Sequence, residues 1–217
     1  MKYMGSKNRI AKHILPIMLA EADKHGITDW VEPMVGGGNM IDKVPSRFRR
    51  VGIDINPHVI FAMIDIRDNP EKFPDYVSEE TYKSYKGSPP SSITSWARFV
   101  CSFGGKFENG YGRSGIRGMA AESKRNALRQ SPNIQGVFFR IGSFEEYSFL
   151  KNCIIYLDPP YKGTTGYKTK PFMYDIFYEW CRKMASQGNI IFISEYSMPS
   201  DFECVWTGQL KRILQIT

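Results

Sequence analysis

The segment Cys153–Tyr161, CIIYLDPPY, constrains the fold of this chain more than any other stretch. Its first part, Cys153–Leu157, is a continuous apolar run with β-branched and aromatic residues, a pattern typical of a strand covered on both faces. Asp158 follows where that strand should end, and Pro159 and Pro160 each fix their own φ and have no backbone N–H. Because a residue before a proline avoids the helical region, we expect Asp158 and Pro159 to be extended.

This corner places a carboxylate, a carbonyl that no helix uses and the ring of Tyr161 at the carboxyl end of a strand. Open α/β sheets bind ligands at that end, so the segment predicts a functional site. The alternative is an ordinary solvated turn, because Asp and Pro are common turn residues and short motifs produce false matches.

A glycine-rich turn follows another predicted strand. Asp29–Pro33 is expected to be a strand, and Val-Gly-Gly-Gly follows it at 35–38. The next predicted strand, Phe48–Ile55, carries Asp54, 18 residues after Gly36. A glycine turn after one strand and an acid after the next is the arrangement that holds a ribose diol. The GxGxxG pattern is absent, so an adenosine-containing methyl donor is favoured over NAD; a plain loop and a helix cap at Asp54 are the alternatives.

The basic residues of the chain are concentrated in one segment. The formal net charge is +7, and the segment 98–130 holds seven Lys or Arg residues against two acidic ones, with glycines and aromatic residues between them. Such a cluster suits a phosphate backbone, whereas the alternative is a solvated basic loop. The sequence therefore predicts DNA as a partner, with Lys106, Arg113, Arg117, Lys124 and Arg125 as the candidate phosphate contacts.

Composition excludes several other classes. The 217 residues suit one domain carrying an insertion. The sequence contains no stretch of about 18 apolar residues, so no membrane span is predicted. The N-terminus lacks the apolar core and cleavage site of a secretory signal. The four cysteines form no CxxC pair, and no His, Cys and acid cluster points to a metal, so we expect free thiols in a reducing cytoplasm and no metal.

Several segments, in order along nearly the whole chain, resemble the motifs of the Dam-type DNA adenine methyltransferases, particularly the compact phage forms. These segments are YMGSK at 3–7, VEPMVGGGN at 31–39, DIN at 54–56, DPPY at 158–161, GTTGY at 163–167 and SEYSMP at 194–199. One departure is Met34, which stands where the family usually has phenylalanine; methionine is still apolar and adaptable.

The resemblance implies an α/β protein with the class I S-adenosylmethionine-dependent methyltransferase fold, a mostly parallel sheet with helices on both faces. It divides the chain into a catalytic domain at 1–60 and 136–217 and a target-recognition insert at 61–135. The implied activity is methylation of adenine N6 in duplex DNA with base flipping, in the cytoplasm of a bacterium or phage-infected cell. Cytosine N4 methylation and a DNA-binding relative without turnover are the alternatives; Asp rather than Ser at 158 favours adenine.

The resemblance also implies the roles of individual residues. The implied catalytic residues are Asp158, Pro159, Pro160 and Tyr161. The implied S-adenosylmethionine-binding residues are Tyr3, Lys7, Glu32, Pro33, Gly36, Gly38, Asp54 and Asp158.

Overall fold

A computed structural model describes residues 1–112, 116–161, 172–208 and 211–216, with the side chains of 116–117 and 211–212 also left undescribed. The described residues form a seven-stranded sheet in the order β3-β2-β1-β4-β5-β7-β6. Its strands are β1 (Asp29–Glu32), β2 (Arg49–Asp54), β3 (Phe138–Ile141), β4 (Cys153–Leu157), β5 (Ile190–Glu195), β6 (Glu203–Gly208) and β7 (Lys211–Ile216). Strands β1 to β5 pair in parallel, and β7 runs antiparallel to β5 and β6.

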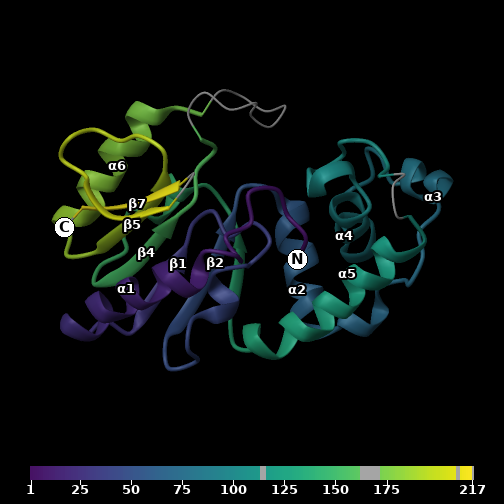
Figure 1. Ribbon diagram of the computed structural model, residues 1–217, viewed down its shortest axis with the longest axis horizontal. Coiled ribbons are helices and arrows are strands. Elements are labelled where there is room, and N and C mark those ends of the chain that lie inside the picture. The colour runs from purple at the N-terminus through teal and green to yellow at the C-terminus, as the bar shows by residue number, and fades with distance from the viewer. Residues whose placement is uncertain (113–115, 162–171, 209–210, 217) are drawn as a thin grey trace.

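Helices cover both faces of this sheet (Figure 1). They are α1 (Ala11–Lys24), α2 (Pro57–Asp68), α3 (Glu79–Ser84), α4 (Ser92–Val100), α5 (Ile116–Gln130) and α6 (Tyr174–Ser186). Side chains alternate along β4: Ile154 and Tyr156 join the core that contains α1 and α2, whereas Ile155 and Leu157 join the core that contains α6. This period of two is that of a strand buried on both faces, so the predicted strand is confirmed. The mostly parallel sheet with helices on both faces also agrees with the predicted architecture.

Helices α3, α4 and α5 gather beside α2, to one side of the sheet (Figure 1). Helix α2 spans residues 57–68 and therefore crosses position 60, where the predicted catalytic domain gives way to the insert. The division of the chain into a catalytic domain and an insert stays a prediction.

The order of the strands reverses at β1. From there β2 and β3 lie on one side, and β4 and β5 lie on the other. Because these five strands are parallel, their carboxyl ends meet at one edge of the sheet. Glu32 ends β1, Asp54 ends β2 and Asp158 follows β4, so this edge brings together three acidic residues that lie far apart in the sequence. Ligands of open α/β sheets bind at such a reversal point.

Candidate active site

The carboxylate of Asp158 is paired with Lys7. The ammonium of Lys7 forms an ion pair with Asp158 Oδ2 and also donates to the carbonyl oxygen of Gly5 at 2.9 Å. The Lys7 side chain is only 3% exposed, and that of Asp158 is 25% exposed. The sequence assigned Lys7 to the donor alone, and the structure places it on the predicted catalytic carboxylate. A carboxylate has about four acceptor sites, so this ion pair leaves it room for further donors.

The ring of Tyr161 is held in place from several sides. Its hydroxyl lies 3.0 Å from Ser194 Oγ on β5, and the Tyr196 ring meets it at 63° with centroids 4.7 Å apart. Lys7 Nζ lies 5.1 Å from the centre of the ring. Burial, followed by the nearby Asp158 charge, raises the pKa of Tyr161 far above its ordinary value of 10, so the phenol stays neutral. Ser194 and Tyr196 belong to the segment 194–199 that carries the resemblance, but the sequence assigns them no role. Their contacts with Tyr161 join parts of the chain more than 30 residues apart, which a sequence pattern does not show.

The carbonyl group of Pro160 in the DPPY corner also has a hydrogen-bond partner. Tyr174, at the start of α6, donates its hydroxyl to the carbonyl oxygen of Pro160 at 2.6 Å. The whole DPPY corner is therefore supported by neighbours from the N-terminal segment, β5 and α6. Residues 162–171, which include the GTTGY segment, lie outside the described part of the chain.

The glycine turn after β1 is tied to the acid that ends β2. Gly36 and Gly38 have φ of 49° and 66°, a region that favours glycine. The amide of Gly36 donates to Asp54 Oδ2 at 3.0 Å, and the amide of Asn56 donates to Asp54 Oδ1 at 2.9 Å. Burial raises the pKa of Asp54 to about 6, so it is charged at neutral pH, with both oxygens oriented by backbone N–H groups.

The N-terminal segment lies directly on this turn. A Cβ added to Gly36 would lie 2.9 Å from the Tyr3 ring, and one added to Gly37 would lie 2.6 Å from the Met1 carbonyl oxygen. The sequence pattern predicts the glycine turn as part of a site that holds a ribose diol. The structure adds a second reason for the glycines, because Tyr3 packs where any larger side chain would sit.

Glu32 and Pro33 come just before the turn in the sequence, and both are buried. The carboxyl of Glu32 accepts a hydrogen bond from Trp30 Nε1 at 2.9 Å. Burial raises the pKa of Glu32 to about 8, and the charges of Asp42 and Asp158 act in the same direction, so this group holds a proton at neutral pH. A neutral Glu32 accepts the hydrogen bond from Trp30 without placing a charge in the core. The role of Glu32 in donor binding stays a prediction.

Arg98 does not belong to the basic surface that the sequence suggested. Only 3% of the residue is exposed, because α4 is packed into the core. Its guanidinium pairs with Glu108 at 2.5 Å and lies over the Phe107 ring at 4.5 Å. Counting Arg98 among the cations available to phosphate was wrong, since its charge is already neutralised inside the protein.

The predicted DNA-binding residues have different surroundings. Arg125 is exposed on α5, and Lys124 on the same helix lies 3.4 Å from Asp75. Lys106 is half-buried in the loop before α5. Arg113 lies outside the described residues, and Arg117 is placed in α5 without a described side chain.

Helix α5 has two distinct faces. Ala120, Ser123, Ala127 and Gln130 recur every three or four residues and are buried. Arg125 and Arg129 lie between them on the exposed side.

The described part of the chain shows no group of three or more His, Cys, Asp or Glu side chains that could hold a metal ion. No described helix is long and apolar enough to cross a membrane.

Residues 3–90 match the family model of the D12 class N6 adenine-specific DNA methyltransferases. Over these residues the match confirms the predicted resemblance to DNA adenine methyltransferases, and the resemblance to the compact phage forms stays a prediction. The match includes Tyr3, Lys7, Glu32 and Asp54 and ends before the corner at Asp158. It supports the predicted enzyme class, an adenine-specific DNA methyltransferase, and S-adenosylmethionine as its methyl donor. No curated protein matches the chain by sequence.

Two solved structures of the rRNA methyltransferase aviRa from Streptomyces viridochromogenes resemble the fold. One is 12% identical, covering 96% of this chain and 84% of aviRa, with a TM-score of 0.50. The other is 13% identical, covering 99% of this chain and 86% of aviRa, with the same TM-score. At this identity the likeness shows the methyltransferase fold alone.

Proposed function

We propose that this chain transfers a methyl group from S-adenosylmethionine to the N6 amine of adenine in duplex DNA, after the base has turned out of the helix. One observation carries the proposal. The Asp158 corner, the glycine turn and Asp54 lie at one edge of the sheet, on the adjacent strands β4, β1 and β2. An acceptor for an amine thus lies beside the elements of a nucleoside site.

The donor would be held by the turn and by Asp54. The Asp54 carboxylate, fixed by two backbone N–H groups, would accept the ribose hydroxyls. Tyr3 and Lys7 would flank the donor from the N-terminal segment, which already lies across this edge. When bound, S-adenosylmethionine supplies a methyl group activated by its sulfonium charge, so the protein contributes mainly orientation.

The amine would be activated by Asp158 and Pro159. The nitrogen of adenine's exocyclic amine is a weak nucleophile, because its lone pair is delocalised into the ring. A carboxylate and a carbonyl that accept hydrogen bonds from its two N–H groups localise that lone pair on the nitrogen. The Asp158 contact strengthens as positive charge develops on nitrogen, which is the kind of interaction that raises the rate. Lys7 keeps the carboxylate in place through a charge-assisted hydrogen bond.

Base capture would rest on Tyr161. A duplex buries the amine edge of adenine, and flipping the base costs roughly a few kcal/mol. Stacking on an aromatic ring returns ~1–3 kcal/mol per base. The Tyr161 ring is held from β5 through Ser194, so less conformational freedom is lost on stacking. The exposed face of α5, with Arg125, would lie along the phosphate backbone.

The test is sequencing, with modified-base detection, of DNA from cells that express the protein. We expect N6-methyladenine at one recurring short sequence, and much less of it in cells expressing the same amount of Asp158→Asn. Unmodified DNA from cells with abundant folded wild-type protein would overturn the proposal. N4-methylcytosine in place of N6-methyladenine would support the cytosine alternative.

A further inference from the structure

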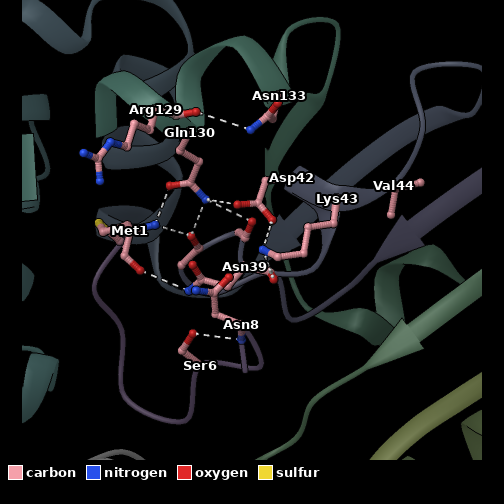
Figure 2. A network of polar contacts seen from close by, with 12 residues as sticks. Met1, Ser6, Asn8, Asn39, Asp42, Lys43, Val44, Arg129, Gln130 and Asn133 are labelled. Atoms are coloured by element: carbon pink, nitrogen blue, oxygen red, sulfur yellow. Dashed lines mark hydrogen bonds and ion pairs between the residues drawn. The ribbon is translucent and has the colours of Figure 1, made fainter. Parts of the chain in front are cut away.

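Gln130 joins α5 to the glycine turn (Figure 2). It is the last residue of α5 and only 6% exposed. Its side-chain Nε2 donates to the carbonyl oxygens of Gly37 and Gly38, both at 3.0 Å, and lies 3.2 Å from Asp42 Oδ2. One amide group thus contacts two acceptors on the turn, 93 and 92 residues away in the sequence, and a third on Asp42, 88 residues away.

These contacts add to the support of the turn, together with the Met1 ammonium, which donates to Gln130 Oε1 and to the Gly37 carbonyl oxygen (Figure 2). Asp54 accepts the Gly36 amide on one side, and Gln130 donates to the next two carbonyl oxygens on the other. Both carbonyl oxygens also have a second donor, since the Met1 ammonium lies 2.6 Å from that of Gly37 and the Asp42 amide lies 3.3 Å from that of Gly38. Gly38 is also closely packed, since an added Cβ would lie 2.4 Å from the end of Met63 and 3.3 Å from Gln130 Nε2. The shape of the turn therefore depends on where α5 ends.

The same helix carries the exposed cation Arg125, five residues before Gln130. Five residues of an α-helix span about 7.5 Å, at 1.5 Å per residue. A helix moves as a rigid element, so a contact that fixes Arg125 on a phosphate also fixes Gln130. DNA bound along α5 would then stabilise one arrangement of the turn before the donor arrives.

We infer that Gln130 is a positioning residue that shapes the donor-binding turn and couples it to α5, so that DNA and S-adenosylmethionine each raise the affinity of the protein for the other. The coupling rests on the proposed function, because it requires DNA on α5. Affinity changes between two sites are reciprocal, so the same factor is measured from either side.

The variant that tests this inference is Gln130→Met, which keeps the length of the side chain and removes its amide. Gln135→Met is the matched control: Gln135 Nε2 donates to the carbonyl oxygens of Arg67 at 2.6 Å and Ser131 at 3.2 Å, contacts that leave the turn untouched. Gln130→Asn is the second variant. It keeps the amide but shortens the side chain by one methylene, and it guards against a Gln130→Met protein that fails to fold.

The measurement is calorimetric titration of S-adenosylmethionine into the full chain, with and without a saturating DNA duplex. We expect the duplex to tighten donor binding to the wild type and to Gln135→Met about fivefold or more. Both Gln130 variants should bind the donor about tenfold more weakly without DNA and lose the effect of DNA. In methyl transfer, the donor KM should rise while kcat stays within about twofold.

Two results would overturn the inference: Gln130 variants with wild-type donor affinity and DNA effect, or wild-type protein that binds both ligands independently. A wild-type protein that binds the donor but no duplex would refute the proposed function instead. In that case the donor affinity of the two Gln130 variants without DNA would still decide whether Gln130 shapes the turn.

Discussion

The sheet edge and the outer face of α5 use charge in opposite ways. At the edge, charged groups are buried or partly buried and have partners: Lys7 pairs with Asp158, and Asp54 accepts hydrogen bonds from two backbone N–H groups. On α5, Arg125 and Arg129 face solvent. Groups that act on a reacting atom must be held in a fixed position before the substrate arrives. Groups that neutralise phosphates must be accessible, and their attraction is then screened by salt.

Arg98 shows that location in the basic segment does not decide which behaviour a cation has. It lies in the same basic segment as Arg125, yet it is buried and paired with Glu108. Its environment resembles that of Lys7 at the sheet edge. The comparison therefore makes separate predictions for fixed charges and for exposed ones, and these differ in kind as well as in size.

The largest effect is expected for Asp158→Asn. Asparagine keeps the size of the side chain. It removes the negative charge that pairs with Lys7 and that would accept a hydrogen bond from the adenine amine. Loss of one preorganised electrostatic contact lowers a rate about a hundredfold or more. Single-turnover methyl transfer should show this fall, whereas DNA affinity should stay within about threefold. Asp175→Asn, on the exposed start of α6, is the control and should retain the wild-type rate.

Arg98→Met should destabilise the fold without a specific effect on DNA. Removing one partner of a buried ion pair costs on the order of 3 kcal/mol, because the other charge is left uncompensated. Urea unfolding should show this loss, and the folded fraction should bind duplex DNA with the wild-type salt dependence. A stable Arg98→Met protein with a reduced salt dependence would place Arg98 on the DNA instead.

Asp54→Asn should weaken donor binding about tenfold, because hydrogen bonds to a charged acceptor are stronger than those to a neutral one. The pKa of Asp54 is raised to about 6, so the wild-type carboxyl is charged above that pH and protonated below it. Wild-type affinity for S-adenosylmethionine should therefore fall as the pH drops from 7 to 5, whereas the affinity of the variant should change little. Parallel pH profiles for the two proteins would exclude Asp54 from the donor site.

Arg125→Ala should weaken binding to all duplex sequences by a similar factor of several-fold. One lost phosphate contact lowers the slope of log affinity against log salt by about 0.9. Lys124→Ala should have a smaller effect, since Lys124 is already paired with Asp75. Fluorescence anisotropy at several salt concentrations measures both quantities. A loss confined to one DNA sequence would mean that Arg125 reads a base.

The last effect is expected for Glu32→Gln, and it concerns the pH dependence of stability. The pKa of Glu32 is raised from 4.5 to about 8, so the folded chain holds an extra proton between those values. Folding stability from this group is therefore lost as the pH rises through that range. Glutamine removes the titration and can still accept from Trp30. The Tm of the variant relative to the wild type should rise from pH 5 to pH 8, whereas a constant difference would contradict a buried, titrating Glu32.

Much of the fold could be predicted because its signals are local. The apolar run at 153–157 and the prolines after Asp158 define a strand and its end without reference to the rest of the chain. Helix α6 likewise has Phe177, Trp180 and Cys181 at helical spacing, and all three are buried. Periodicity within a segment determines such features, so one sequence suffices.

The contacts between distant segments could not be predicted. The ion pair of Lys7 with Asp158 joins residues 151 positions apart, and the Gln130 contacts with the turn join residues 92 and 93 positions apart. The burial of Arg98 depends on the packing of α4 and on a loop that brings Glu108 to it. A charge pattern shows that a cation is present but not whether a partner from elsewhere in the chain neutralises it.

The most direct test of the account is to identify the methylated nucleoside. Purified wild-type protein and Asp158→Asn are each incubated with a defined DNA duplex and S-adenosylmethionine carrying an isotopically heavy methyl group. The DNA is then digested to nucleosides and analysed by mass spectrometry. The account predicts heavy N6-methyldeoxyadenosine with the wild type and about a hundredfold less with Asp158→Asn. Heavy methyl groups on another nucleoside, or equal yields from the two proteins, would contradict it.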